Sequence, residues 1–335
     1  MYAHMPIIRD ILYGAANRGA SLGNLCDELS ISTEELNDSE KFLDFERSYK
    51  AWEKAVEFTE DQLLGLHLGE TSNPSIMGLI GHLMQSSPDL EKAFQTVCEY
   101  GKVATDMFTY SIQKKDDQVL LSYEPSSQWM LISPNSARQA VEQAMAGTLH
   151  VFKVLSGKKI APIFTRLTMA KPKSIEEYER VFQSPLEFNA PVAQLKFKAS
   201  DLFQPVISYD KSLYVLFDKL LHEKSEALRH QLTFTDQVKK LITIEFKGQV
   251  PSVEVAASRM NMTGRSFQRR LQLEGKSYRT ISSQLRKEFA LRLLNTSNSK
   301  MEEIADVLGY SEASAFRRAF KTWTDAAPNK VRRAS

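Results

Sequence analysis

An internal repeat in the last third of this 335-residue chain limits the folds that the chain can adopt. At an offset of 49 residues, Val255-Ala256, Phe267 and Leu271 recur as Ile304-Ala305, Phe316 and Phe320. Within each copy the two large apolar residues are four positions apart, so in a helix they share one face. The small alanines upstream would let a second helix approach closely. The repeat therefore predicts two copies of one helix–turn–helix unit.

Residues suited to helix ends stand at matching places in both copies. In the first copy, Ser252 and Thr263 are expected to cap the two helices, and Asn261 to take the left-handed conformation in the turn between them. In the second copy these roles fall to Ser299, Ser311 and Gly309. The local signals therefore agree with the repeat.

The outer face of the second helix in each copy is polar or basic. We predict base contacts from Arg265, Ser266, Gln268 and Arg269 in the first copy and from Ala313, Ser314, Arg317 and Arg318 in the second. Arginine can donate two hydrogen bonds to guanine, glutamine can pair with adenine, and a helix fits the major groove. The alternative is a basic, solvated pair of helices in a packing module. Two matched copies favour DNA binding over that alternative.

Charge is distributed unevenly along the chain. Residues 234–335 hold 19 Lys and Arg against 10 Asp and Glu, whereas the remainder holds 24 against 31. This asymmetry fits a polyanion-binding module joined to an acidic sensing or oligomerising module. A lysine at the far end of a recognition helix is expected to meet phosphate rather than a base. The predicted phosphate contacts are Thr263, Lys276, Ser277, Ser311, Lys321 and Lys330.

The first two hundred residues mix helical and strand-like patterns. Helical spacing of apolar residues occurs in 7–15, 42–56, 90–100 and 140–154, with Pro88 expected in a first helical turn. The strand-like segments 109–112 and 119–123 flank a polar stretch and predict a hairpin, and 163–169 and 195–197 predict further short strands. The N-terminal half is therefore expected to be an α+β domain.

An amphipathic stripe occupies 209–228, between the two halves. Its apolar residues would either pack on their own domain or pair two subunits, and the predicted dimerisation residues are Leu213, Phe217, Leu220 and Leu221. Residues 225–233 are polar and predict a linker. The expected organisation is a regulatory domain at 1–205, an amphipathic helix and linker at 206–232, and a DNA-binding domain at 233–335.

Several chemistries lack the residues that they need. Cys26 and Cys98 are isolated, and the six histidines show no metal-ligand spacing, so we expect no metal, no cofactor, no redox switch and no enzyme activity. Without a signal peptide or a long apolar span, the chain is expected in the reducing cytoplasm and not in a membrane. The sequence does not identify the effector-binding residues. Candidates to line a pocket or simply to fill the core are Trp52, Trp129, Met77, Met84, Met107, Met130 and Met145.

The motif IADVLGYS at 304–311, followed by FRRAFK at 316–321 and by Ala327-Pro328, gives residues 234–333 a specific resemblance. This part is similar to the DNA-binding domain of AraC/XylS family transcription regulators. The resemblance implies seven helices, a central helix at about 278–294, and two recognition helices in successive major grooves. It also implies base contacts at Arg265, Gln268, Arg269, Ala313, Ser314 and Arg318. Asp325 stands where the family usually has glycine, and Ala313 has no hydrogen-bonding group, so the second helix is expected to read fewer bases.

The segments 64–70, 77–82, 86–93 and 182–191 resemble the effector domain of AraC-family members of the ornithine-responsive type, over about 7–205. That domain is sometimes labelled arabinose-binding. This half lacks the closely spaced strands and turns of a jelly-roll sugar pocket, so the label implies little here.

Together these features predict a sequence-specific DNA-binding transcription regulator, an activator whose N-terminal domain senses a small molecule. Its expected partners are double-stranded DNA, RNA polymerase, an effector and a second copy of the chain. The alternative is a constitutive DNA-binding protein whose N-terminal half only dimerises. An enzyme carrying the same module, as in alkylation-repair proteins, would need a zinc-bound cysteine cluster, which two isolated cysteines cannot supply.

Overall fold

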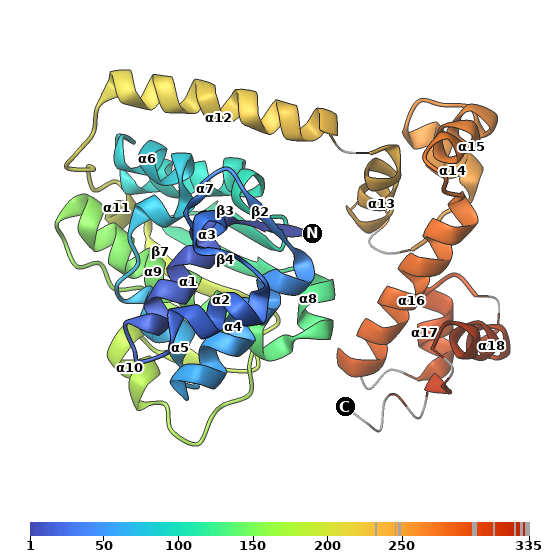
Figure 1. Ribbon diagram of the computed structural model, residues 1–335, viewed down its shortest axis with the longest axis horizontal. Coiled ribbons are helices and arrows are strands. Elements are labelled where there is room, and N and C mark those ends of the chain that lie inside the picture. Colours follow the sequence, from blue (N-terminus) through green and yellow to red (C-terminus); the bar gives the residue numbers. More distant parts are fainter. Residues whose placement is uncertain are drawn as a thin grey trace. The chain divides into compact units, whose positions relative to one another are not determined.

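The computed structural model describes residues 1–335 except 232, 245, 247–248, 297–299, 311, 325, 329–330 and 332–335. The chain forms two compact units, Met1–Glu226 and Ala227–Ser335 (Figure 1). The first unit mixes helices and sheet, and the second is helical, which confirms the predicted fold class. Within the described residues, no helix is both long enough and apolar enough to span a membrane.

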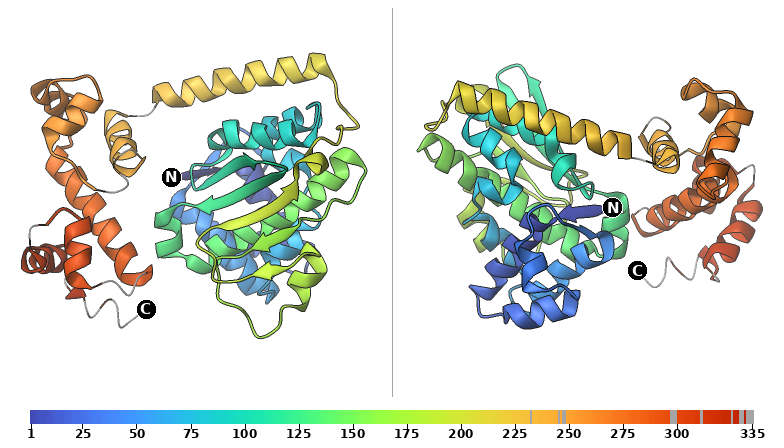
Figure 2. Two further views of the ribbon diagram at one scale, coloured as in Figure 1. Left: turned by 180° about the vertical axis from the view of Figure 1, so that it is seen from behind. Right: turned by 45° about the horizontal axis from the view of Figure 1, so that its top comes forward.

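The first unit is built around a five-stranded sheet. Its helices are α1 (Met5–Ala16), α2 (Leu22–Leu29), α3 (Thr33–Asn37), α4 (Phe45–Thr59), α5 (Leu64–Gly69), η1 (Pro74–Met77), α6 (Leu79–Gln85), α7 (Leu90–Ala104), α8 (Ser127–Ile132), α9 (Pro134–Ser156), α10 (Glu176–Phe182) and α11 (Ala199–Leu202). The sheet has the order β3 (Phe108–Lys115), β4 (Gln118–Pro125), β7 (Ala193–Lys198), β5 (Phe164–Arg166) and β6 (Leu186–Glu187). A separate two-stranded sheet pairs β1 (Tyr2–His4) with β2 (Phe42–Asp44). Figure 2 shows the five-stranded sheet from behind, with helices on its other side.

Local sequence explains where most of these elements begin. The predicted hairpin forms between β3 and β4, with Asp116 in the left-handed conformation at its turn (φ 53°). The helix predicted at 90–100 begins at Leu90 rather than at Pro88, because the Asp89 carboxylate accepts a hydrogen bond from the Lys92 N–H at 2.7 Å. The helix predicted from Phe42 begins three residues later as α4, because Phe42 belongs to β2. Strand β5 is shorter than the predicted segment 163–169.

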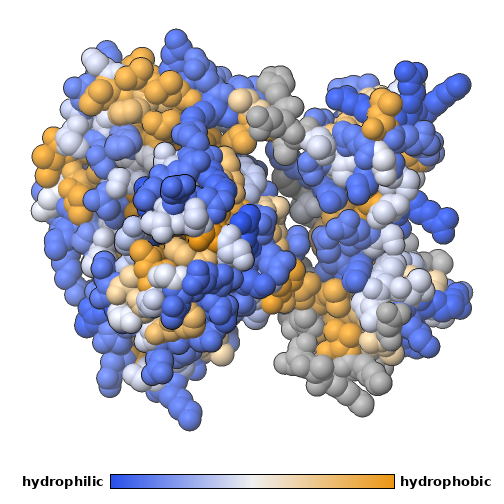
Figure 3. All heavy atoms as spheres, in the orientation of Figure 1, coloured by the Kyte–Doolittle hydropathy of each residue, from blue (hydrophilic) through white to orange (hydrophobic). Residues whose placement is uncertain are grey.

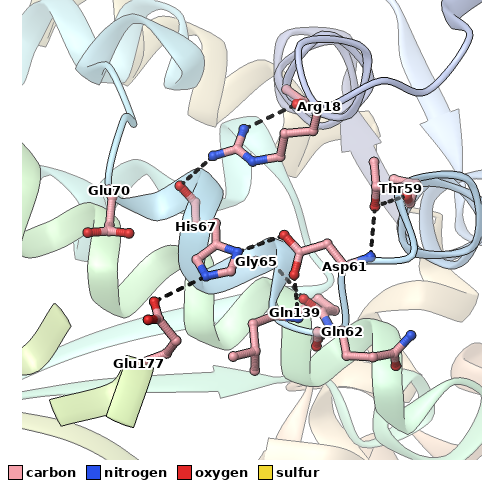
Figure 4. Close-up of polar contacts among 12 residues, drawn as sticks. Arg18, Thr59, Asp61, Gln62, Gly65, His67, Glu70, Gln139 and Glu177 are labelled. Atoms are coloured by element: carbon pink, nitrogen blue, oxygen red, sulfur yellow. Dashed lines mark hydrogen bonds and ion pairs between the residues drawn. The ribbon is translucent and has the colours of Figure 1, made fainter. Parts of the chain in front are cut away.

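Helices α5 and α9 pack with unusually close backbones. A Cβ added to Gly65 would lie 2.0 Å from the carbonyl oxygen of Gln139, so only glycine fits there. The Gln139 side chain also accepts a hydrogen bond from the Gly65 N–H at 2.6 Å (Figure 4). On α5, His67 Nδ1 lies 2.7 Å from Asp61 Oδ2, and its Nε2 lies 3.4 Å from Glu177 Oε2. These contacts make His67 a hydrogen-bonded structural residue.

Helix α12 (Lys211–Gln231) carries the predicted amphipathic stripe. Leu221 is fully buried, and the Phe217 ring stacks on His82 with centroids 5.5 Å apart, so these two residues pack on their own domain rather than lying free for a partner. Leu213 and Leu220 are 45% and 37% exposed. Figure 3 shows hydrophobic side chains over the part of the first unit along which α12 runs. The predicted stripe therefore divides into a packed side and an exposed side.

The second unit has six helices within its described residues, and Pro328 and Val331 are helical as well. The six are α13 (Phe234–Ile244), α14 (Val253–Arg259), α15 (Gly264–Leu273), α16 (Tyr278–Thr296), α17 (Met301–Val307) and α18 (Ala313–Thr324). They surround two small cores, one for each copy of the repeat. Helix α16, the predicted central helix, supplies Ile281 and Leu285 to the first core and Ala290 and Leu294 to the second. One continuous helix thus joins the two copies of the repeat.

Candidate nucleic-acid interface and an N-terminal cavity

The first helix–turn–helix unit forms from the predicted local signals. The Ser252 hydroxyl accepts a hydrogen bond from the Val255 N–H at 3.3 Å and begins α14. The Thr263 hydroxyl does the same for the Ser266 N–H at 3.2 Å and begins α15. Between them Asn261 has φ 54°, the left-handed conformation predicted for this turn. The two caps and the turn between α14 and α15 therefore form as the sequence predicts.

Buried aromatic contacts fix the rotation of α15 about its axis. Phe267 is fully buried, with its ring centroid 5.3 Å from that of Phe234 and 5.5 Å from that of Tyr278. Because the Phe267 side of α15 packs into the core, the opposite side is exposed. It carries the four predicted base-contacting residues, Arg265, Ser266, Gln268 and Arg269. The two arginines and the glutamine make no hydrogen bond or ion pair with any described residue. Their donor groups are available to a ligand.

The second helix–turn–helix copy repeats this arrangement with differences. Gly309 has φ 77° in the turn, and Phe316 and Phe320 of α18 are fully buried. Ser299 and Ser311, the predicted caps, lie outside the described residues. The N-cap of α17 is Lys300, one residue after Ser299, and its N–H donates to the Glu303 carboxylate at 3.0 Å.

The predicted base-contacting residues of α18 differ in their burial and in their polar contacts. Ala313 is half-buried and packs against the second core, whereas Ser314, Arg317 and Arg318 are exposed. Ser314 donates to the Glu312 carboxylate at 2.9 Å, and Arg317 Nη2 lies 3.5 Å from Glu302 Oε1. The Arg318 guanidinium makes no hydrogen bond or ion pair with any described residue. Arg318, at the position equivalent to Arg269, is therefore the predicted arginine of α18 whose donor groups are available to a ligand.

The predicted phosphate contacts fall into three groups. Lys276 and Lys321 are exposed. Thr263 and Ser277 are exposed too, but their hydroxyls cap helices: Ser277 Oγ accepts from the Thr280 N–H at 3.1 Å. Ser311 and Lys330, like Asp325, lie outside the described residues.

Sequence reasoning missed the side chains that brace this domain. The Glu274 carboxylate, after the end of α15, accepts hydrogen bonds from the N–H groups of Phe234 and Thr235 at 2.5 and 2.8 Å, and so caps α13. On α16, Lys287 donates to the carbonyl of Trp323 at 2.7 Å and Arg286 to that of Leu308 at 3.3 Å. No local signal marks these residues, since each partner lies at least 22 residues away in the sequence.

The first unit contains a separate apolar cavity of about 120 Å³. Its walls come from β1, α1, α4, η1, α6, α7, β3, α8 and α9. Of the candidate pocket residues, the ones that line it are Trp52, Trp129, Met77, Met84 and Met107. Met145 instead fills the core, and Met130 is exposed.

Comparison with protein families agrees with both halves of the chain. A model described as the arabinose-binding domain of AraC transcription regulators, N-terminal, matches residues 19–206, and a helix-turn-helix domain model matches residues 256–334. The chain belongs to the AraC family of transcription regulators. This confirms the resemblance of both halves.

Similar proteins extend over most of the chain. The ornithine utilization regulator of Pseudomonas aeruginosa is 28% identical over 323 residues, covering 95% of this chain and 93% of that protein. The HTH-type transcriptional regulator VqsM of the same organism is 24% identical over 280 residues, covering 80% and 83%. The crystal structure of the transcriptional regulator CdpR from Pseudomonas aeruginosa covers 93% of this chain and 96% of its own, at 22% identity and a TM-score of 0.44. The family, the ornithine utilization regulator and VqsM are transcription regulators, so this AraC-family chain is a DNA-binding regulator rather than an enzyme.

Proposed function

We propose that α15 and α18 enter successive major grooves on one face of a DNA duplex, with Arg265, Gln268 and Arg269 reading bases in one groove and Arg318 in the next. The observation that carries this proposal is the pair of exposed faces, each with a free arginine at the same place in its repeat, held by the single helix α16. Recognition helices that read successive grooves must lie about 34 Å apart along the duplex. In this proposal, residues 1–205 form the effector domain, 206–232 the amphipathic helix and linker, and 233–335 the DNA-binding domain.

Salt dependence tests the electrostatic part of this proposal. The affinity of the full chain for a duplex selected from a random library should fall steeply with salt, because Lys and Arg side chains release counterions from phosphates. Random duplex should show a similar salt slope at lower affinity. Binding that is insensitive to salt would contradict the assignment of this basic domain to DNA.

We also propose that the N-terminal domain senses a small molecule, for which the apolar cavity supplies the space. The name of one relative concerns ornithine use. Ornithine carries two ammonium groups and a carboxylate, and no charged side chain lines this cavity, which argues against ornithine there. A bound effector changes DNA affinity only if it binds two states of the protein differently. Affinity for the selected duplex, measured with and without compounds that raise the melting temperature, tests the sensing role.

A constitutive, dimerising regulator is the second candidate, favoured by the exposed leucines of α12, Leu213, Leu216 and Leu220. It predicts that no compound changes the affinity for DNA. Under both candidates, the family resemblance supports a cytoplasmic activator that contacts RNA polymerase. Transcription in vitro from a template carrying the selected site, with purified polymerase, would distinguish activation from repression.

A further inference from the structure

The walls of the N-terminal cavity define the chemistry of a molecule that could fill it. None of its lining side chains carries a charge. Apolar residues from distant parts of the chain dominate the lining, and they include Ile7, Ile11, Trp52, Phe94, Phe108 and Phe152. An ion moved from water into such a space would lose its hydration without gaining a partner. The lining therefore selects against charged molecules.

Several polar side chains in the lining keep a hydrogen-bonding atom without a partner among the described residues, and Tyr110 and Gln143 are two of them. The Tyr110 hydroxyl has no hydrogen bond to any described residue, and burial raises its pKa, so it stays protonated and can donate. The Gln143 amide donates to Asp10 at 2.8 Å, which leaves its oxygen as an acceptor. By contrast, Thr148 donates to the carbonyl of Ala144 at 2.8 Å and accepts from Tyr123 at 2.9 Å. The cavity thus offers a few hydrogen-bonding groups, Tyr110 and Gln143 among them, in a mostly apolar wall.

The volume limits the size of the occupant. The cavity measures about 120 Å³, and engineered apolar cavities of about 150 Å³ bind benzene. Residues from nine elements line this small volume. A short hydrocarbon chain or one small ring fits such a space.

We propose that this cavity binds an uncharged, mostly hydrocarbon molecule with one hydrogen-bonding group, and that Tyr110 donates a hydrogen bond to that group. The inference rests on the proposed sensing role and specifies the class of effector. It also assigns ligand contacts to residues that the sequence left open, since Trp52 and Trp129 would lie against the bound molecule.

A matched set of six-carbon probes tests the charge selectivity. We expect 1-hexanol to bind the full chain saturably, to change the tryptophan fluorescence and to raise the melting temperature, since a ligand of the folded state stabilises it. Hexanoate and hexylammonium have the same chain but a charged end, and should bind about tenfold more weakly or worse. Equal binding of hexanol and either ion would overturn the inference.

A pair of substitutions on α9 locates the binding. Val151 lines the cavity, whereas Val154, three residues later, is 50% exposed and outside the lining. Val151→Phe should abolish hexanol binding, and Val154→Phe should leave it unchanged. If both variants bind hexanol equally, the molecule binds elsewhere and the inference fails.

A gentler variant keeps the test decisive if Val151→Phe does not fold. Tyr110→Phe should weaken hexanol binding several-fold but leave the binding of benzene, which has no hydrogen-bonding group, unchanged. Loss of both, or of neither, would remove Tyr110 from the proposal. Because binding is measured without DNA, hexanol binding in the cavity supports the inference even if no compound alters DNA affinity, and that second result would contradict only the sensing role.

Discussion

Arg269 and Lys321 have different predicted tasks, although both are exposed on recognition helices. Arg269→Ala should cost about 1–3 kcal/mol on the selected duplex and much less on random duplex, because a guanidinium that reads a base edge discriminates between sequences. Lys321→Ala should weaken both duplexes alike, since phosphates carry no sequence information. Fluorescence anisotropy titrations on the two duplexes measure these differences. Equal losses for Arg269→Ala on both duplexes would mean that the base-reading face is wrongly assigned.

Single residues could be predicted from the sequence where their conformation is a local property. Asn261 and Gly309 take left-handed conformations, which few other residues adopt, and Thr263 caps the helix that it precedes. Glu274 could not be predicted in the same way, because its role depends on the N-terminus of α13, some 40 residues earlier.

Glu274 should make the stability of the C-terminal domain depend on pH. Burial alone would raise its pKa, but hydrogen bonds from Thr235 and Phe234 and the charge of Arg270 outweigh it and lower the pKa. The stabilisation is therefore complete above the usual carboxylate range and is lost as the pH falls through this lowered value. Glu274→Gln should cost about 0.5–2 kcal/mol at neutral pH, as for other helix caps.

Hydrogen exchange of the α13 amides, compared with those of α9, measures this effect in the full chain. Glu254→Gln, an exposed change in the first turn of α14, serves as the matched control. If α13 exchanges equally in the wild type and in Glu274→Gln from neutral to acid pH, the carboxylate does not stabilise this helix.

Among the elements, long periodic helices were predicted better than short pieces. Helices α1, α7 and α9 follow the predicted apolar spacing, whereas α16 was expected from the family resemblance. The start of α4 was wrong because Phe42 pairs in β2 and its ring lies 5.1 Å from that of Tyr2, a contact that spacing cannot reveal. The two residues of β6 are too few to show any period.

The exposed leucines of helix α12 allow a test of whether this helix pairs two subunits. If its exposed leucines pair two subunits, Leu213→Glu combined with Leu220→Glu should give a folded monomer, because two charges in an apolar seam lack partners. Light scattering after size-exclusion chromatography gives the mass in solution. Phe217→Glu is the informative comparison, since its loss of stacking on His82 should destabilise the domain itself. A double variant that stays dimeric would place the interface elsewhere.

At the scale of the whole molecule, the order of an acidic α+β part followed by a basic helical part was predictable from charge and from the repeat. The cavity was not, because its walls bring together nine elements whose packing no single segment encodes. The tryptophan and methionine candidates illustrate this limit: five of the seven line the cavity, one fills the core and one is exposed.

The central claim is that the two copies of the repeat read DNA separately, one groove each. Selection of bound sequences from a random duplex library, with the wild type, Arg269→Ala and Arg318→Ala, tests it most directly. We expect two blocks of preferred bases about 10 base pairs apart, with Arg269→Ala losing preference within one block and Arg318→Ala within the other. A single block, or loss of the same positions in both variants, would contradict it.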